Sequence, residues 1–349
     1  KYPIVSISTM NKNCIYTASN HNDHIVIISS DTPASLFRYN TGLETHDGTL
    51  VFSETNDDDG VGVIVDNQNS QIAYTKFYND FSPPRVAKVN IDTMTQIGST
   101  YQASADDALR GWIGLEQDDL HLYVTSGTPA LLFKVRKSDM AQLAFNAIHS
   151  AREIYIEALA VDENFVYTFT GVTTMVITRF AISDLKLIDH TPVSSGCTTC
   201  QYAFWSVRIS GAVIVNSLDT SNSDRVIYTK FTGLPTTTST TTTLPTQPLN
   251  RSDMIEGVSG ELGYAWFTHD NISTIFVVTQ ESPAKVVAND VLTASRTAAV
   301  TLNSGENNGG AISYHNGKVY VATETNPCIV VQLSASPLAR ETATPLTGY

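Results

Sequence analysis

The sequence predicts an all-β protein, a β-propeller of seven four-stranded blades formed by residues 1–349 as a single domain. Three observations predict it. Apolar residues alternate with a period of two and β-branched residues dominate, which is typical of strands. A similar unit recurs about every fifty residues, which is the spacing of propeller blades rather than of helical repeats. Signals for helices are nearly absent.

The repeat is marked by an aromatic or aliphatic residue at a strand centre, followed closely by Thr or a small polar residue. The markers are Tyr16, Tyr74, Tyr123, Tyr167, Ile214, Trp266 and Tyr320, at steps of 58, 49, 44, 47, 52 and 54 residues. Several markers are followed by a strand that ends in a long polar side chain, at Lys88, Lys134, Arg179 and Lys230. Asp92, Asp139 and Asp184 then occupy similar turns before a short last strand. A further short strand before each marker brings the unit to four.

Such a four-stranded unit cannot bury both of its faces alone, but units stacked in a ring cover one another and leave only short edges. A sandwich of two sheets is the rival architecture, and the seven similar units argue against it. Eight blades remain an alternative, because residues 41–57 lengthen the first interval and contain one more candidate strand.

The composition fits a large all-β domain. Of the 349 residues, 42% are hydrophobic and only 16% are charged. The 34 acidic and 21 basic residues give a net charge of −13. Because an acidic surface repels phosphate backbones and anionic lipids, we expect no nucleic-acid partner. No apolar run approaches the ~18 residues that a transmembrane helix needs, so we expect no membrane insertion.

The chain opens with Lys1-Tyr2-Pro3, without an initiator Met or a signal-peptide pattern. We therefore expect a mature chain whose secretion signal has been removed, located outside the cell as a secreted protein or part of a surface appendage.

Four cysteines fit one or two disulfides in an oxidising compartment. Cys197 and Cys200 have the C-x-x-C spacing of redox or zinc sites, but no second ligand pair or following helix is evident, so a small disulfide-closed loop is favoured. Cys14 and Cys328 lie in the first and last repeats, where a bridge between them would fasten the ring. Two buried thiols are the alternative, and both interpretations stay open.

A Thr/Pro-rich tract at residues 235–248 predicts an insertion between blades five and six. Such tracts bury too little apolar surface to fold alone, and in secreted chains they are typical O-glycan acceptors. The predicted O-glycosylation sites are Thr236, Thr237, Thr238, Ser239, Thr240, Thr241, Thr242 and Thr243. A bare linker between blades is the alternative. Asn250 and Asn271 begin the two N-x-S/T sequons and are the predicted N-glycosylation sites.

No residue pattern predicts a catalytic, metal or cofactor site. The acidic stretch at residues 56–60 lacks the ligand spacing of a calcium loop and is interpreted as a solvated turn. His21 and His24 lie close together, but loop histidines without a role are the commoner case. The sequence contains no nucleophile elbow, phosphate-binding loop, dinucleotide fingerprint or zinc-protease helix motif. We therefore expect a protein that is not an enzyme and that holds no cofactor.

Two stretches resemble a repeat of secreted proteins from algae, other protists and bacteria. That repeat has an aromatic strand, a Thr-Ser-Pro turn, a Val-Lys-Val strand and then Leu-Asn-Ser-Gly-Glu-Asn before the next blade. Residues 82–98 match the turn and the second strand, and residues 300–308 contain the whole polar hexapeptide. The resemblance implies a propeller on the outside of a cell. Some members of this family look like components of flagellar hairs (mastigonemes) and other extracellular fibres, and the family brings no catalytic residues.

The leading hypothesis for function is a structural one: a glycosylated subunit that packs with copies of itself, as a homo-oligomer or helical filament, in a mastigoneme-like extracellular assembly. An extracellular module that binds a carbohydrate or a protein on one face of the ring is the alternative. An extracellular hydrolase or lyase is the third, and a perturbed carboxylate at the mouth of the channel would favour it.

Overall fold

The alternating apolar pattern produces strands throughout the described part of the chain, which contains 29 strands and no helix. The structure is a computed structural model. It describes residues 14–21, 23–29, 33–52, 60–77, 83–103, 114–126, 130–148, 158–171, 175–192, 200–209, 212–219, 225–232, 246–248, 266–270, 273–290, 293, 295–325 and 327–346. The predicted all-β class is confirmed. The described residues include no helix long and apolar enough to cross a bilayer.

The strands form seven antiparallel sheets, and each sheet uses strands that are consecutive in the sequence. Sheet 1 contains β1 (Cys14–His21), β2 (His24–Ser29), β3 (Ser35–Asn40) and β4 (Thr45–Val51), and sheet 2 contains β5 (Gly60–Val65), β6 (Ile72–Phe77), β7 (Arg85–Asn90), β8 (Thr95–Gln96) and β9 (Tyr101–Gln102). Sheet 3 contains β10 (Leu115–Gln117), β11 (His121–Ser126), β12 (Leu131–Arg136) and β13 (Gln142–Ala147). Sheet 4 contains β14 (Ala158–Val161), β15 (Phe165–Gly171), β16 (Met175–Ala181) and β17 (Leu187–Pro192).

Sheet 5 contains β18 (Cys200–Ile209), β19 (Ala212–Asp219), β20 (Arg225–Thr232) and β21 (Thr246–Pro248). Sheet 6 contains β22 (Trp266–His269), β23 (Thr274–Val278), β24 (Lys285–Asp290) and β25 (Ser295–Thr301). Sheet 7 contains β26 (Gly309–His315), β27 (Lys318–Thr323), β28 (Ile329–Ala335) and β29 (Leu338–Pro345). Six sheets have four strands, while in sheet 2 the fourth strand is split, so that β8 and β9 both pair with β7.

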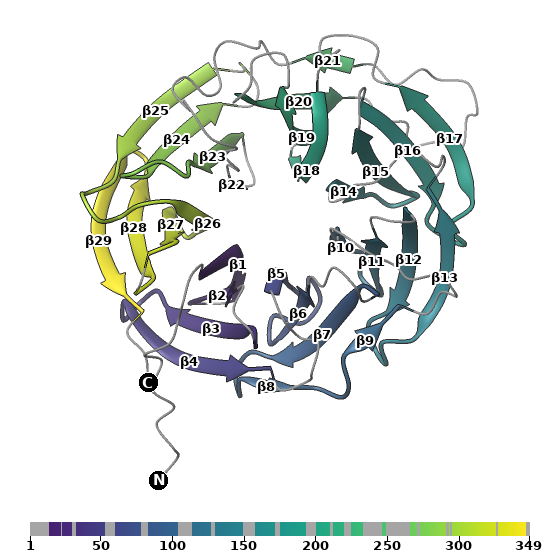
Figure 1. The fold of residues 1–349 in the computed structure, drawn as a ribbon, viewed down its shortest axis with the longest axis horizontal. Coiled ribbons are helices and arrows are strands. Elements are labelled where there is room, and N and C mark those ends of the chain that lie inside the picture. Colours follow the sequence, from purple (N-terminus) through teal and green to yellow (C-terminus); the bar gives the residue numbers. More distant parts are fainter. Residues whose placement is uncertain are drawn as a thin grey trace.

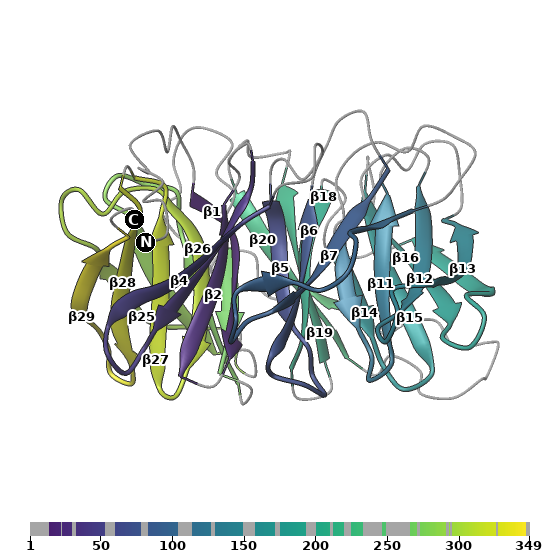
Figure 2. The ribbon, with the colours of Figure 1, turned by 90° about the horizontal axis from the view of Figure 1, so that it is seen from below.

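The sheets follow one another around a common centre, with the first strand of each sheet innermost and the last outermost (Figure 1). The strands run between two opposite ends of the molecule (Figure 2). Because consecutive strands are antiparallel, the turns from first to second strand and from third to fourth strand lie at one end. β1 of sheet 1 lies beside β26 of sheet 7.

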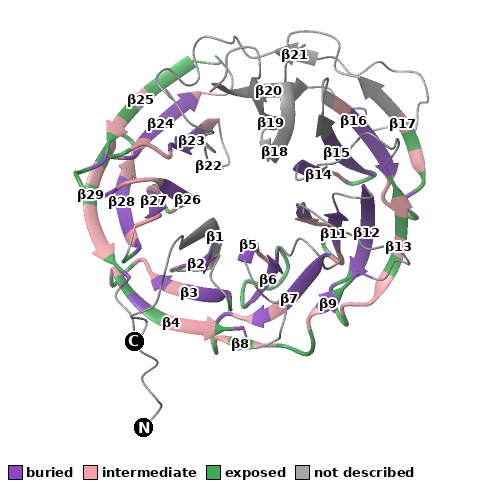
Figure 3. Cartoon of the chain, in the orientation of Figure 1, coloured by how far each residue is buried: buried purple, intermediate pink, exposed green. Residues whose placement is uncertain are grey.

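The apolar core lies between neighbouring sheets. One cluster of buried side chains joins sheets 6, 7 and 1, a second joins sheets 1 and 2, a third joins sheets 2 and 3, and a fourth joins sheets 3 and 4. Burial is greatest on the inner strands and falls toward the outermost strands (Figure 3). From sheet 6 through sheets 7, 1, 2 and 3 to sheet 4, each sheet therefore covers the apolar face of the next, as expected for units that cannot cover themselves.

Two of the seven predicted markers are one strand out of place. Five markers lie in the second strand of a sheet, but Tyr16 lies in β1 and Trp266 lies in β22, which are first strands. The second strands of these two sheets, His24–Ser29 and Thr274–Val278, have no tyrosine or tryptophan. In these two sheets the prediction therefore placed the marker on an aromatic residue of the preceding strand.

The predicted Asp turns are present as connections between third and fourth strands. The turns that contain Asp92, Asp139 and Asp184 each have one non-glycine residue in the left-handed region, namely Met94, Met140 and Leu185, and Glu44 has the same conformation in the corresponding turn of sheet 1; the φ values lie between 50° and 59°. In sheets 1, 3, 4, 6 and 7 the register between the third and fourth strands shifts. A turn with one left-handed residue and a bulge is thus a repeated feature of the unit.

The end of the Thr/Pro-rich tract belongs to sheet 5, whereas the whole tract was predicted to be an insertion between blades five and six. Its last residues, Thr246–Pro248, form β21 and pair with β20, which gives sheet 5 its fourth strand. Residues 233–245, with all eight predicted O-glycosylation sites, lie outside the described residues.

Candidate functional site

An aspartate caps the turn between the first and second strands in several sheets. In sheet 2, Asp66 Oδ1 accepts the backbone N–H groups of Gln68 (2.7 Å) and Asn69 (3.2 Å). Asp118, Asp162 and Asp270 accept two backbone N–H groups in the same way in sheets 3, 4 and 6. Aspartate is suited to this position because its short side chain bonds to the backbone two or three residues ahead.

In three sheets the capping aspartate also holds the marker tyrosine of the second strand. The Tyr hydroxyl donates to Asp Oδ2 at 2.7 Å for Tyr74–Asp66, 2.6 Å for Tyr123–Asp118 and 2.8 Å for Tyr167–Asp162. Burial, and then the bonded carboxylate, raise the pKa of Tyr74 and Tyr123 far above the usual value. These three markers therefore have a structural role, which is to fix the turn to the second strand.

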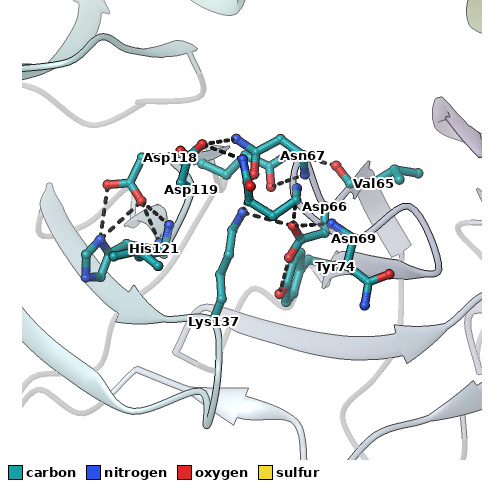
Figure 4. A network of polar contacts seen from close by, with 12 residues as sticks. Val65, Asp66, Asn67, Asn69, Tyr74, Asp118, Asp119, His121 and Lys137 are labelled. Carbon is teal, nitrogen blue, oxygen red and sulfur yellow. Dashed lines mark hydrogen bonds and ion pairs between the residues drawn. The ribbon is translucent and has the colours of Figure 1, made fainter.

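A network of polar contacts joins the turns of sheets 2 and 3 (Figure 4). At its centre is Lys137, which is only 5% exposed. Lys137 Nζ donates to Asn67 Oδ1 at 2.7 Å, lies 3.4 Å from Asp66 Oδ1 and lies 5.9 Å from the centre of the Tyr74 ring. These partners matter because a buried charge needs compensation. Removing one partner of a buried ion pair typically lowers the free energy of unfolding by about 3–5 kcal/mol.

The contacts of this network shift the pKa values of Asp66 and Lys137. Burial alone would raise the pKa of Asp66, but hydrogen bonds from Gln68 and Tyr74 and the charge of Lys137 outweigh it and hold the pKa below its usual value. Burial lowers the pKa of Lys137, and Asp66 opposes that shift.

Amide side chains complete the junction between sheets 2 and 3. Asn67 and Gln68 donate to Asp119 Oδ1 at 2.9 Å and 2.8 Å, and Gln117 donates to the carbonyl of Val65 at 2.7 Å. The turn of one sheet is therefore held to the turn of the next by side chains from both (Figure 4).

The long polar residues predicted on the third strands lie directly opposite the second strands' central residues, and two of their side chains, Lys88 and Lys134, reach the next sheet. Lys88 donates to the carbonyl of Lys137 at 2.8 Å, and Lys134 donates to the carbonyls of Ile182 and Ser183 at 2.6 Å and 3.2 Å. Arg38 of sheet 1 does the same to Ile91 and Asp92 of sheet 2, both at 2.8 Å. We call these contacts the inter-sheet clasps. They run from sheet 1 to sheet 2, from sheet 2 to sheet 3 and from sheet 3 to sheet 4.

Sheet 7 makes a related contact to sheet 1. Gln332, at the clasp position of β28, donates to Glu44 Oε1 at 3.4 Å. Tyr39 of sheet 1 donates to Thr344 Oγ1 of sheet 7 at 3.4 Å, and its ring packs edge-to-face on Tyr320 at 6.3 Å. Arg179 is different, because it pairs with Asp189 in its own sheet and lies over the Phe165 ring. The Lys230 side chain lies outside the described residues.

The polar hexapeptide of residues 302–307 connects sheet 6 to sheet 7. Glu306, only 5% exposed, forms an ion pair with Arg340 of β29 and accepts the backbone N–H of Asn303 at 2.7 Å. Backbone bonds from Leu302 to Ala284 (2.8 Å) and from Ala284 to Glu306 (2.9 Å) fix both ends of the segment. The carboxylate therefore stabilises the connection and the outer strand of sheet 7 together.

The innermost strand of sheet 3 contains a carboxyl group that sequence analysis missed. Burial raises the pKa of Glu116 to about 7, against the opposing effects of the Gln117 N–H and the Lys76 charge. Lys76 itself is only 3% exposed. A Cβ on Gly62 would lie 2.2 Å from Lys76 Cε, so the lysine chain lies over the backbone of β5. The signal in the sequence was a charged residue within the short segment Gly114–Gln117. A single Glu does not by itself indicate a buried carboxyl, because most glutamates are exposed.

The cysteine predictions are not decided by the described residues. Cys328 is 1% exposed and lies in the core shared by sheets 1, 6 and 7. Its carbonyl accepts the N–H of Leu346 at 2.7 Å, as the carbonyls of Ala34, Ala130 and Ala284 do at the same position of their sheets. The side chains of Cys14 and Cys200 and all of Cys197 lie outside the described residues, so both disulfides stay predictions.

Some of the other predicted positions lie within the described residues and some lie outside them. His24 lies 3.1 Å from Asp47 Oδ2 in sheet 1, whereas the His21 side chain lies outside the described residues. Asn250, Asn271 and most of the acidic stretch at 56–60 also lie outside them. Within the described ranges, no group of three or more His, Cys, Asp or Glu side chains is placed to hold a metal ion.

Comparisons with known proteins bear on the fold alone. No protein-family model and no curated protein matches the sequence. Among solved structures 1566 chains match, so the architecture is widespread. One of them is hydrazine synthase of Kuenenia stuttgartiensis, at a TM-score of 0.66, with 11% sequence identity over 95% of this chain and 99% of that chain. At that identity the likeness concerns the arrangement of the sheets and carries no statement about activity.

Proposed function

We propose that the chain is a closed, seven-bladed β-propeller that serves as a structural subunit of an extracellular, glycosylated assembly of the mastigoneme type. The observation that carries this proposal is the set of inter-sheet clasps. They tie sheet 1 to 2, sheet 2 to 3 and sheet 3 to 4 through buried or half-buried cationic side chains, and Gln332 makes the matching contact from sheet 7 to sheet 1.

A ring fastened in this way is suited to bear load. Each clasp donates from a cation to a carbonyl, a type of bond that contributes about 1.5–3 kcal/mol when a charged group takes part. The shared apolar clusters resist the same separation of sheets. A rigid disc whose outer strands remain accessible is a reasonable building block for stacking or side-by-side packing, and the Thr-rich tract supplies the glycan acceptors that the hypothesis expects.

Imaging the protein as isolated from its source, before denaturation, tests the proposal. We expect ordered filaments or arrays with a repeat that fits one ring per subunit. Mass spectrometry of the same material is expected to place hexose or similar additions on the peptide that contains residues 236–243. Native material that consists only of dispersed, unmodified monomers would contradict the proposal.

A second candidate is an extracellular hydrolase or lyase with its site near the centre of the ring, and Glu116 favours it. A half-buried carboxyl that titrates near neutral pH and lies close to a buried lysine is a common feature of active sites. Turnover of polysaccharides or glycoconjugates, measured with the wild-type protein and with Glu116→Gln, separates the candidates. Activity that the substitution abolishes would favour the enzyme, and the absence of turnover in both would favour the structural role.

A further inference from the structure

The outer strand of sheet 3, β13, differs from the outer strands of the other sheets in its side chains. Edge strands of soluble proteins normally carry a charge, a proline or very few residues, which prevents pairing with other chains. The other outer strands follow this rule: β4 contains Asp47, β8 and β9 have two residues each, β17 contains Asp189, β21 contains Pro248, β25 contains Arg296, and β29 contains Arg340 and Glu341. β13 reads Gln-Leu-Ala-Phe-Asn-Ala and has none of these.

The exposed positions of β13 are all apolar. Leu143 is 46% exposed, Phe145 is 55% exposed, and Ala147 is exposed beside them, while the alternate residues are partly covered (Figure 3). The split fourth strand of sheet 2 explains this exposure. β8 and β9 are two-residue strands, so a full-length outer strand that would cover this face of β13 is missing from sheet 2 in the described part of the chain.

The backbone of β13 also presents an open edge. The N–H of Ile148 donates to the carbonyl of Ala130 at 2.8 Å, so residues 144 and 146, which alternate with it, point their backbone groups toward β12. Phe145 and Ala147 therefore point their N–H and C=O groups away from the sheet. Among the described strands, β13 pairs with β12 alone.

Phe145 is held in place before any partner arrives. Its ring stacks on the buried ring of Phe133, directly across the ladder, with centroids 6.1 Å apart and planes inclined by 27°. An exposed aromatic side chain that is already ordered loses little conformational entropy on association, which is typical of an anchor residue.

We infer that β13 is a docking edge for a second copy of this chain, and that two β13 strands pair antiparallel around a twofold axis at Phe145. In this register Phe145 lies opposite Phe145, and Leu143 lies opposite Ala147, so a large side chain meets a small one. The charge of the chain favours this strand as the contact. Two copies with a net charge of −13 repel each other, and β13 is an uncharged edge at which they can approach. The pairing supplies one contact of the proposed assembly and rests on that role.

Sedimentation velocity of the full-length chain over a concentration series tests the pairing. The wild-type protein is expected to form a dimer, and Phe145→Lys is expected to weaken the dimer by at least about tenfold. Ile188→Lys is the matched control, because Ile188 is a 38% exposed apolar residue on the neighbouring outer strand β17. It is expected to leave the dimer unchanged. Phe145→Thr keeps a strand-forming residue and provides a second variant if the lysine variant fails to fold.

Hydrogen exchange identifies the edge directly. The amides of Phe145 and Ala147 are expected to be protected in the dimer and to exchange rapidly in the monomer. A wild-type chain that stays monomeric at every concentration overturns the inference, and so does a dimer that persists in both Phe145 variants or leaves these amides unprotected. Native filaments whose subunits make no contact through β13 would contradict the docking edge but not the proposed structural role. Dimers that form through β13, without any native assembly, would contradict the proposed role but not the docking edge.

Discussion

Lys137 of sheet 3 and Asp66 of sheet 2 form an ion pair between two sheets, with Nζ and Oδ1 3.4 Å apart and both side chains 7% exposed. Ile91 and Ile182 occupy the position of Lys137 in sheets 2 and 4, where the backbone N–H makes the same bond to the preceding turn. Sheet 3 therefore has a charged residue where its two neighbours have an apolar one, and the turn of sheet 2 stabilises the charge.

Replacing Lys137 by the isoleucine of sheets 2 and 4 is expected to lower stability. Lys137→Ile leaves Asp66 buried with its remaining hydrogen bonds, so a loss of about 1–3 kcal/mol in the free energy of unfolding is expected. Asp66→Ala is expected to cost more, about 3–5 kcal/mol, because it also removes the turn cap and leaves a buried lysine without its carboxylate. Urea unfolding measures both.

The neighbouring residue supplies the control for this experiment. Arg136 forms an ion pair with Asp139 in which the side chains are 46% and 50% exposed. Exposed pairs contribute little because solvent screens them, so Arg136→Ala is expected to unfold at nearly the same urea concentration as the wild-type protein. Equal effects of Lys137→Ile and Arg136→Ala would show that burial adds nothing to the Lys137–Asp66 contact.

Removing the hydroxyl of Tyr123 is expected to have an effect that depends on pH. Burial would raise the pKa of Asp118, but hydrogen bonds from Tyr123, Leu120 and His121 outweigh it and lower the pKa. The stability that these bonds contribute is therefore present above the unfolded pKa of about 3.9 and is lost as pH falls through the lower folded value. Tyr123→Phe is expected to cost about 1.5–3 kcal/mol at neutral pH and clearly less in acid.

Tyr320→Phe is the matched comparison, since Tyr320 lies at the same position of sheet 7 but bonds to the Thr41 hydroxyl. Its cost is expected to be about 0.5–1.5 kcal/mol and nearly constant with pH. Chemical unfolding of both variants at neutral and acid pH decides the matter, and parallel pH profiles would argue against a charged partner for Tyr123.

The period of the repeat could be predicted from the sequence because each second strand needs the same apolar centre, and Tyr74, Tyr123, Tyr167 and Tyr320 all lie there. The long polar residues after the markers were also visible, at Lys88 and Lys134 for example. Their partners were not, because they bond to backbone carbonyls of the next sheet, and a carbonyl carries no sequence signal. Glu116 was missed for a related reason, since its pKa depends on burial and on a lysine from another sheet.

The glycines that begin two innermost strands are expected to be intolerant of any side chain. A Cβ on Gly60 would lie 2.2 Å from Ile28 Cγ1 and 2.5 Å from the Ser29 carbonyl oxygen. A Cβ on Gly309 would lie 2.1 Å from Val278 Cγ2 and 3.0 Å from the Thr279 carbonyl oxygen. Both glycines thus allow a first strand to approach the second strand of the preceding sheet. Gly60→Ala and Gly309→Ala are each expected to cost about 2 kcal/mol or more through overpacking.

Gly42→Ala is the control for the glycine variants. A Cβ there would make only an ordinary contact, 3.5 Å from Asn40 Oδ1. Its effect is expected to stay within about 0.5–1 kcal/mol of wild type. Thermal and urea unfolding measure all three, and a tolerated Gly60→Ala would contradict the close approach of β5 to β2.

Glu116 is expected to make the protein less stable as the pH rises. Its folded pKa of about 7 lies above the unfolded value, so the fold favours the protonated form. The cost of ionising this half-buried carboxyl is absent below the unfolded pKa of about 4.3, grows as pH rises, and is complete above the folded pKa. Glu116→Gln cannot ionise. It is expected to be close to wild type near pH 4–5 and more stable by about 1–3 kcal/mol above pH ~8. Glu163→Gln changes an exposed glutamate in the turn between β14 and β15 and is the matched control for the loss of one carboxyl group. If urea unfolding gives Glu116→Gln the same difference from wild type at both ends of this range, the carboxyl is not desolvated on β10, and the case for a proton-transferring group at the centre of the ring is lost with it.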